Sequence, residues 1–186
     1  MSTAIVVGSL AEVATRNGLS IAESFVSAEA IILVDVSGSM YAHDSRGGKS
    51  RYDVALSELA SLQRSMPGKL AVIAFSDSAL FVPGGVPPLL GLGTDVAGAL
   101  QFAKVADVPG MRFFLISDGE PDDERKALDV AKTFAAHIDT IYVGPESDPI
   151  GRAFLQRLAK ATGGQSATAD RVCELATTAQ RMLLGV

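Results

Sequence analysis

Short runs of consecutive apolar residues alternate along the chain with segments in which apolar residues recur every three or four positions. The short runs are rich in isoleucine, valine and phenylalanine, and uninterrupted runs of this kind are typical of strands that are covered on both faces. We expect such strands at 30–36, 70–75, 112–117 and 138–143. A shorter run at 79–82 follows the second strand closely enough to pair with it antiparallel at the edge of the sheet.

The segments between these strands have the spacing of amphipathic helices. Proline and glycine mark several of their ends: Pro67-Gly68 stops the first, Gly163-Gly164 stops the fourth, and Pro121 with the acids after it opens the third. Helices are expected over 52–66, over 96–103, from Pro121 onward, from Asp148 to Gly163, and over 172–183. This alternation predicts an α/β fold: a doubly wound, Rossmann-like, mainly parallel six-stranded sheet with one antiparallel edge strand and helices on both faces.

The chain of 186 residues divides into two parts. Residues 29–186 carry the strand–helix alternation, and their number is typical of one domain. Residues 1–28 stand outside that alternation, and Asn17-Gly18 separates two short helical patterns at 9–16 and 20–27. We therefore interpret residues 1–28 as an N-terminal accessory extension that packs on the main domain.

Composition and charge argue against several classes of function and against a location in or beyond the membrane. The 16 Lys and Arg residues are outnumbered by 21 Asp and Glu residues, and a net charge of -5 provides no basic surface for direct binding to nucleic acid. The apolar runs fall short of the roughly 18 residues of a membrane span, and no basic region precedes the first apolar stretch as in a secretory signal. The single cysteine excludes an intrachain disulfide. We expect a cytoplasmic protein with no membrane association.

Small oxygen-bearing side chains gather where the predicted strands end. Asp35, Ser37 and Ser39 follow the first strand in a D-x-S-x-S run, Asp118 follows the strand at 112–117, and Thr94 precedes the helix at 96–103. Ligands of doubly wound sheets bind at the carboxyl ends of the strands, so we expect these five residues to meet there. Two carboxylates and three hydroxyls, without cysteine or histidine, are hard oxygen ligands. This set favours Mg²⁺ or Mn²⁺ over zinc or copper.

The arrangement resembles the von Willebrand factor A (VWA) domain family, in particular its stand-alone prokaryotic or phage-type members. The metal ion-dependent adhesion site (MIDAS) of that family combines a D-x-S-x-S run, a distant threonine and an aspartate after the fourth strand, and all five positions are filled here. The resemblance covers about residues 30–184. It implies that Ser37 and Ser39 bind the ion directly, and that Thr94 binds it directly or through water. It also implies that Asp35 and Asp118 ligate the ion or orient its waters.

The resemblance further implies a non-enzymatic protein-binding module that depends on a divalent cation. An ion held mainly by neutral hydroxyls and water keeps positive charge, so an Asp or Glu of a partner protein can complete its coordination. Stand-alone bacterial relatives often work with MoxR-type AAA+ ATPases or within ribonucleoprotein assemblies. A MoxR-type ATPase is therefore one expected partner.

Two other functions stay open on the sequence. A scaffold subunit of an AAA+ ATPase or ribonucleoprotein complex would use the same fold. A magnesium-dependent phosphohydrolase would resemble the haloacid dehalogenase-type phosphatases, whose D-x-D-x-T motif has a second carboxylate where this chain has Ser37. Without that carboxylate, the motif has no general acid.

The residues around the motifs also have simpler interpretations. Asp, Ser and Thr commonly cap helices, so each predicted site residue taken alone fits that role. Arg46, Lys49 and Arg51, beside the first motif, form either an ordinary solvated loop or a rim that recognises an acidic partner. Many of the acids lie near the expected carboxyl ends of the strands, where a bound divalent ion would add two positive charges.

Overall fold

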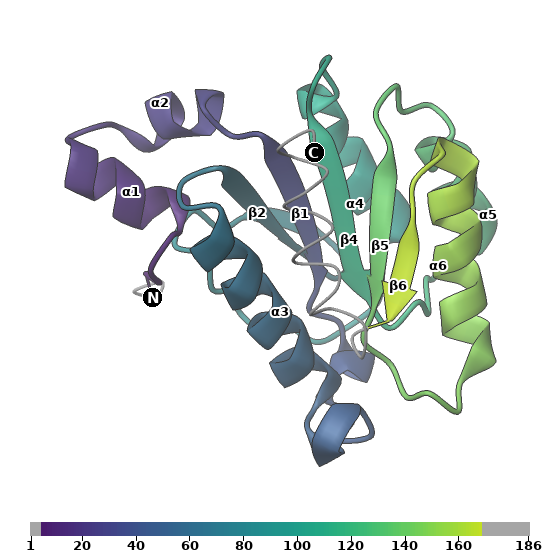
Figure 1. Ribbon diagram of the computed structural model, residues 1–186. Coiled ribbons are helices and arrows are strands. Elements are labelled where there is room, and N and C mark those ends of the chain that lie inside the picture. The colour runs from purple at the N-terminus through teal and green to yellow at the C-terminus, as the bar shows by residue number, and fades with distance from the viewer. Residues whose placement is uncertain (1–4, 169–186) are drawn as a thin grey trace.

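Residues 5–168, which the computed structural model describes, form a six-stranded sheet with helices on both faces (Figure 1). The order of the strands across the sheet is β3-β2-β1-β4-β5-β6, and every neighbouring pair of these strands is parallel except β2 and β3. This confirms the predicted sheet and its antiparallel edge strand. The helix predicted over 172–183 lies outside the described residues. The strands are β1 (Ala30–Asp35), β2 (Leu70–Phe75), β3 (Ala79–Phe81), β4 (Arg112–Ser117), β5 (Ile138–Tyr142) and β6 (Ser166–Thr168).

The apolar pattern did not locate β6. Its three residues, Ser-Ala-Thr, are all half-buried and form no apolar run. Pairing with β5 places them instead: Thr140 N donates to Gln165 O at 2.8 Å, and Thr140 Oγ1 donates to Ser166 Oγ at 2.8 Å. The last strand of the sheet is therefore defined by its neighbour and not by its own sequence.

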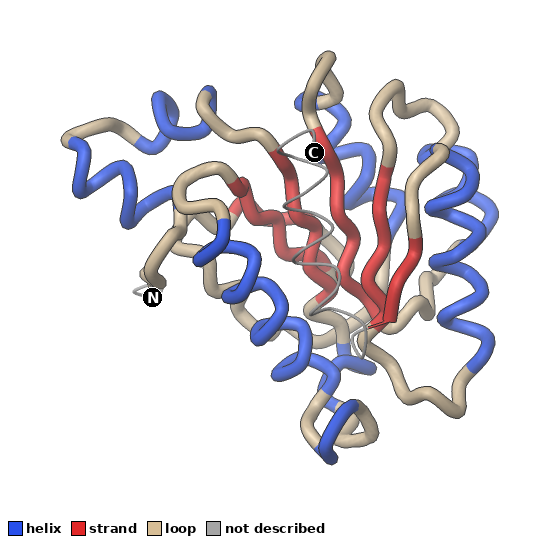
Figure 2. Tube along the Cα trace, viewed as in Figure 1, coloured by secondary structure: helices blue, strands red, loops and turns tan. Residues whose placement is uncertain are grey.

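Helices cover both faces of the sheet (Figure 2), and the side chains of β1 alternate between two apolar layers, one on each face. Ile31 and Leu33 lie in one layer, and Ile32 and Val34 lie in the other, all without solvent exposure. This burial on both sides explains why the strand is continuously apolar. The helices are α3 (Arg51–Ser65) on the Ile32 side, and α4 (Val96–Ala103), α5 (Glu124–Ala131) and α6 (Pro149–Thr162) on the Ile31 side.

The start of α6 agrees with the expectation from the sequence, whereas the start of α5 does not. Asp148 caps α6 as expected. The expected start of the third helix at Pro121 is wrong, because Asp123 is the N-cap of α5 and accepts a hydrogen bond from Lys126 N at 2.9 Å. Pro121 and Asp122 therefore remain in the loop that follows β4, and this loop belongs to the candidate site.

The N-terminal segment packs against the β2–β3 side of the domain. Backbone hydrogen bonds join it to the turn before β2, from Gly68 N to Gly8 O at 2.9 Å, and to the loop after β3, from Ala11 N to Pro83 O at 2.9 Å. Leu10 is 1% exposed and belongs to the apolar layer that contains α4. The helices of this segment are α1 (Leu10–Asn17) and α2 (Ile21–Val26).

We expect Leu10→Ala to destabilise the whole domain, because the change removes a buried side chain from the core. The free energy of unfolding, measured by urea denaturation, should fall by roughly 2–5 kcal/mol, the usual cost of such a truncation. Leu19→Ala is the control: this leucine of the same segment is 43% exposed, and its loss should cost less than about 0.5 kcal/mol. Equally small effects of the two changes would show that the segment adds nothing to the core.

Candidate functional site

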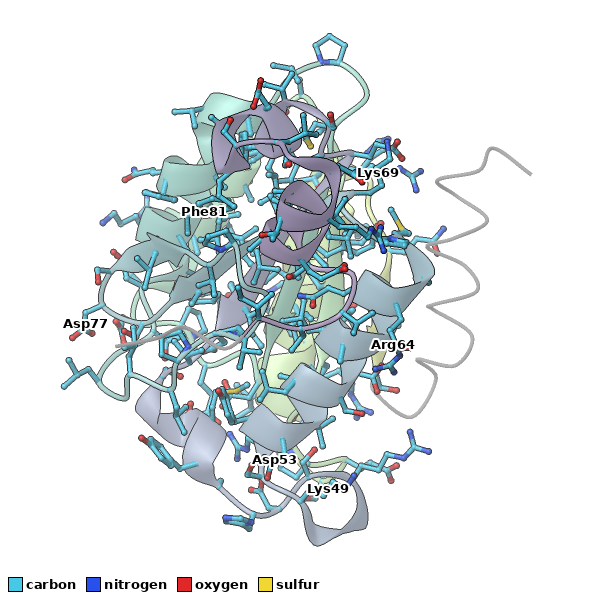
Figure 3. All side chains as sticks on the ribbon, turned by 90° about the vertical axis from the view of Figure 1, so that its left-hand side faces the viewer. Lys49, Asp53, Arg64, Lys69, Asp77 and Phe81 are labelled. Carbon is cyan, nitrogen blue, oxygen red and sulfur yellow. The ribbon has the colours of Figure 1, made fainter. Side chains whose placement is uncertain are left out.

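The predicted site residues lie in three loops at one end of the sheet. Because β1 and β4 are parallel neighbours, the loops that follow them leave the sheet at the same end, the lower end in Figure 1. Figure 3 labels Lys49 and Asp53 at this end, and Lys69, which precedes β2, toward the opposite end. The five residues are Asp35, Ser37 and Ser39 at and after the end of β1, Thr94 before α4, and Asp118 after β4.

Hydrogen bonds from two directions hold the Asp35 carboxylate. The register pairs Val34 with Ile116, so Asp35 and Ser117 follow side by side at the ends of the two strands. The Ser117 hydroxyl donates to Asp35 Oδ2 at 2.7 Å, and Ser37 N donates to Oδ1 at 2.9 Å. Each carboxylate oxygen therefore has a donor inside the protein, and Asp35 is completely buried.

The two serines of the motif place their hydroxyls next to each other. Ser37 Oγ and Ser39 Oγ are 3.1 Å apart, which is hydrogen-bonding distance. Ser37 is buried, whereas Ser39 is half-buried and follows the exposed Gly38 at the start of a short 3-10 helix. A pair of hydroxyl oxygens thus lies near the surface, beside the buried end of β1.

Hydrogen bonds join the loop that contains Leu92 and Thr94, the threonine loop, to both of the other loops. Gly38 N donates to Leu92 O at 3.0 Å, which connects the threonine loop to the loop that contains Ser37 and Ser39, the serine loop. Thr94 N donates to Asp122 Oδ2 at 2.9 Å, and Asp122 N donates to Thr94 O at 3.1 Å, which connects it to the loop after β4. Thr94 itself is 5% exposed. The structure therefore brings all three predicted loops into contact.

An arginine pairs with the buried Asp118. Arg51 Nη1 donates to Asp118 Oδ2 at 2.8 Å and to Glu120 Oε1 at 3.1 Å. Its Nε and Nη2 donate to the two carboxylate oxygens of Asp44, both at 2.9 Å. Arg51 is 8% exposed and Asp118 is fully buried. The interpretation of Arg51 as part of a solvated loop or exposed rim is therefore wrong, because its guanidinium is a buried counter-charge among three carboxylates.

The two buried aspartates differ in their electrostatic surroundings. Burial, and then the charge of Asp118, raises the pKa of Asp35 to about 7, although hydrogen bonds from Ser37 and Ser117 oppose this shift. Hydrogen bonds with Asp44 raise the pKa of Arg51 above its already high usual value, so the guanidinium stays charged. Within residues 5–168, Asp118 thus has a cationic partner at 2.8 Å, whereas no ion pair forms to Asp35.

Two glycines bring the loop after β4 into backbone contact with α6. Gly119 has a φ of +80°, in the left-handed region that favours glycine, and a Cβ there would overlap the carbonyl oxygen of Gly151. A Cβ on Gly151 would in turn overlap the carbonyl oxygen of Asp118. The position of Asp118 therefore depends on two neighbouring residues that have no side chain.

The donor set fits a hard divalent cation. Residues 5–168 contain no cluster of three or more His, Cys, Asp or Glu side chains able to hold a metal by themselves, so an ion here would depend on the serine and threonine hydroxyls. Oxygen donors of this mixed kind suit Mg²⁺ or Mn²⁺. The raised pKa of Asp35 agrees with this fit, because a buried carboxylate without a cationic partner gains from a cation beside it.

Three supporting residues were not predicted from the sequence. Ser117 precedes Asp118 directly, and the register of β1 and β4 was the signal that could have revealed its contact with Asp35. Asp122 was assigned to a helix start, although it binds the threonine loop. Arg51 lies 67 positions from Asp118 in the sequence, and no local pattern indicates their pairing. Its neighbours Arg46 and Lys49 are exposed.

Comparison with known proteins gives relatives only among solved structures. No protein-family model matches the chain, and no curated protein is found as a relative. An aerotolerance-related membrane protein from Bacteroides fragilis is 18% identical with a TM-score of 0.68, and the match covers 86% of this chain and 100% of that chain. The BatB protein from Bacteroides thetaiotaomicron is 18% identical with a TM-score of 0.62, over 83% of this chain and 98% of the other.

Similar structures also include proteins described by the VWA name. A von Willebrand factor type A structure from Catenulispora acidiphila is 18% identical with a TM-score of 0.58, over 84% of this chain and 42% of that chain. The vWF domain of the type V pili tip protein Mfa5 from Porphyromonas gingivalis is 12% identical with a TM-score of 0.57, over 83% and 95%. Likeness at these identities concerns the fold and not the function. The chain has a von Willebrand factor A-like fold.

Proposed function

We propose that this protein is a non-enzymatic module that binds a partner protein through a divalent cation. The observation that carries the proposal is the meeting of two buried carboxylates and two adjacent serine hydroxyls at the ends of β1 and β4. In doubly wound sheets, ligands bind beyond the carboxyl ends of the strands where the strand order reverses, and β1 and β4 are neighbouring strands at that point here. The VWA-like fold supports a role in protein interaction.

Each predicted site residue has a role in this proposal. Ser37 and Ser39 would ligate the ion through their hydroxyls, and Thr94 would do so directly or through water. Asp35 and Asp118 would ligate the ion or orient its waters. When bound, Mg²⁺ or Mn²⁺ offers a coordination position to an Asp or Glu carboxylate of the partner.

The absence of enzymatic activity is part of the proposal. A phosphohydrolase of the D-x-D-x-T kind needs a second carboxylate as general acid, and Ser37 stands in its place. The hydroxyl of Ser37 lies 3.1 Å from that of Ser39, which suits two oxygen ligands of one ion. These contacts support binding over catalysis.

The partner and the location are the less specific parts of the proposal. Similar structures include a pilus tip protein and an aerotolerance-related membrane protein, which supports a protein partner without identifying it. A MoxR-type AAA+ ATPase is the candidate that the family resemblance suggests. No helix within residues 5–168 is both long and apolar enough to span a bilayer. The cytoplasmic location stays a prediction.

Millimolar Mg²⁺ or Mn²⁺ should raise the melting temperature, because an ion that binds only the folded state stabilises it. At a free ion concentration 100 times Kd the gain is about 2.7 kcal/mol, or roughly 5–10 °C for a chain of this size. Asp35→Ala and Ser37→Ala should abolish the shift measured by calorimetry against EDTA. Ser65→Ala, which removes a hydroxyl that donates to Leu62 O within α3, is the control and should keep it. A melting curve of the intact protein that metal leaves unchanged would contradict the metal site.

In EDTA, the free energy of unfolding should fall as the pH rises from about 4 to about 7. The folded protein holds a proton on Asp35 up to its pKa of about 7, whereas the unfolded chain releases it near the ordinary value of 3.8. The unfolded state therefore binds fewer protons between these values, and stability decreases with pH. Urea denaturation from pH 5 to 8 should show this slope in the intact protein but not in Asp35→Asn.

Asp129→Asn is the matched control for this experiment, since Asp129 is an exposed acid that pairs with Lys132 on the surface. Its stability should follow that of the intact protein across the pH range. Parallel curves for the intact protein and Asp35→Asn would show that Asp35 titrates outside this window.

Capture of the partner should require the cation. When the immobilised protein is exposed to a lysate of its native host, we expect a set of proteins that is retained with Mg²⁺ and released by EDTA. The Ser37→Ala variant should not retain this set, whereas Ser65→Ala should. Retention of the same proteins in EDTA would contradict the role of the ion in binding.

A further inference from the structure

We propose that Arg51 weakens the binding of the divalent ion by the free protein and so sets the affinity of the site; this inference rests on the proposed metal site. Arg51 Nη1 lies 2.8 Å from Asp118 Oδ2. A permanent positive charge is therefore paired with one of the two carboxylates that the ion would use. The guanidinium and the ion compete electrostatically for the same negative charge.

The charges of the groups at the site explain this competition. Asp35 and Asp118 supply two negative charges when both are ionised, and the three hydroxyls supply none. Arg51 is paired with one of the two, so these buried groups present less negative charge to an incoming divalent ion than the two carboxylates would alone. Asp35, Asp118 and Arg51 are buried, and charges in such surroundings interact more strongly than in water. An ion bound there keeps surplus positive charge, which strengthens its attraction for a partner carboxylate.

Two further carboxylates keep Arg51 in place. Asp44 accepts from Nε and Nη2 at 2.9 Å each, a two-point contact that fixes the plane of the guanidinium, and Glu120 accepts from Nη1 at 3.1 Å. The side chains of Asp44 and Glu120 are 43% and 50% exposed, so water and salt screen their charges better than those of the buried groups. Arg51 is thus anchored from the solvent side while its charge acts on the buried side.

The place of Arg51 in α3 also points to the site. It is the first residue of the helix, where the partial positive charge of the helix end disfavours a cation. Helix stability therefore does not explain an arginine at this position. The side-chain hydrogen bonds that Arg51 makes within the described residues go to the three carboxylates around the candidate site.

The test compares Arg51→Gln, which removes the charge, with Arg51→Lys, which keeps it. Isothermal titration with Mn²⁺ alone should show roughly tenfold to hundredfold tighter binding by Arg51→Gln than by the intact protein, within the usual range of coupling between sites. Arg51→Lys keeps the positive charge but loses the two-point contact with Asp44, so its affinity for Mn²⁺ should lie closer to that of the intact protein than the affinity of Arg51→Gln does. Arg157→Gln, which removes an arginine from an exposed pair with Glu124, is the control and should bind Mn²⁺ as the intact protein does.

A purely structural role for Arg51 makes a different prediction, since loss of the pairing would loosen Asp118 and leave Mn²⁺ binding unchanged or weaker. That result in a folded Arg51→Gln would overturn the inference. If Arg51→Gln is unfolded in EDTA, the refolding of this variant is measured as Mn²⁺ is added. Refolding at Mn²⁺ concentrations that do not saturate the intact protein supports the inference. Failure to refold overturns it. Mn²⁺ binding by neither protein would contradict the metal site itself, whereas binding by Arg51→Gln alone supports both.

Discussion

Two carboxyl groups that water does not reach, at the ends of neighbouring strands, constrain most of the polar contacts at this end of the molecule. Asp35 and Asp118 are completely buried, and a buried charge is costly unless hydrogen bonds or an opposite charge compensate it. Ser117 and the backbone of the serine loop compensate one of them in part. Arg51 compensates the other. The three loops are held together by the contacts that this burial requires.

The order of the strands creates the place where these groups meet. β1 lies between β2 and β4, and the segments that follow β1 and precede β4 pack on opposite faces of the sheet, with α3 on one face and α4 on the other. The strand order therefore reverses beside β1, and sheets of this class bind ligands beyond the strand ends at such a point. Since α3 begins at this same end, its first residue reaches across to the loop after β4.

Much of the fold follows from local sequence, whereas the contacts that complete the site do not. Apolar runs located β1, β2, β4 and β5, because strands buried on both faces have no polar alternation. The short apolar run after β2 located the partly exposed edge strand β3. The strand β6 was missed because only its pairing defines it. The motif predicted which loops meet, but the partner of Asp118 comes from a residue 67 positions away, through tertiary contact that no local pattern encodes. The start of α5 was misplaced because Asp122 bonds to another loop.

The backbone contact between Gly119 and Gly151 has a practical consequence for changing what this protein binds. Side chains cannot be added at either position without pushing the loop after β4 away from α6, so this loop is a poor place to introduce sequence variation. The loop around Leu92 is the opposite case, since this leucine is 75% exposed and already carries a side chain at positive φ. A library that aims at new binding preferences should therefore vary Leu92, keep Thr94, and leave the glycine pair untouched.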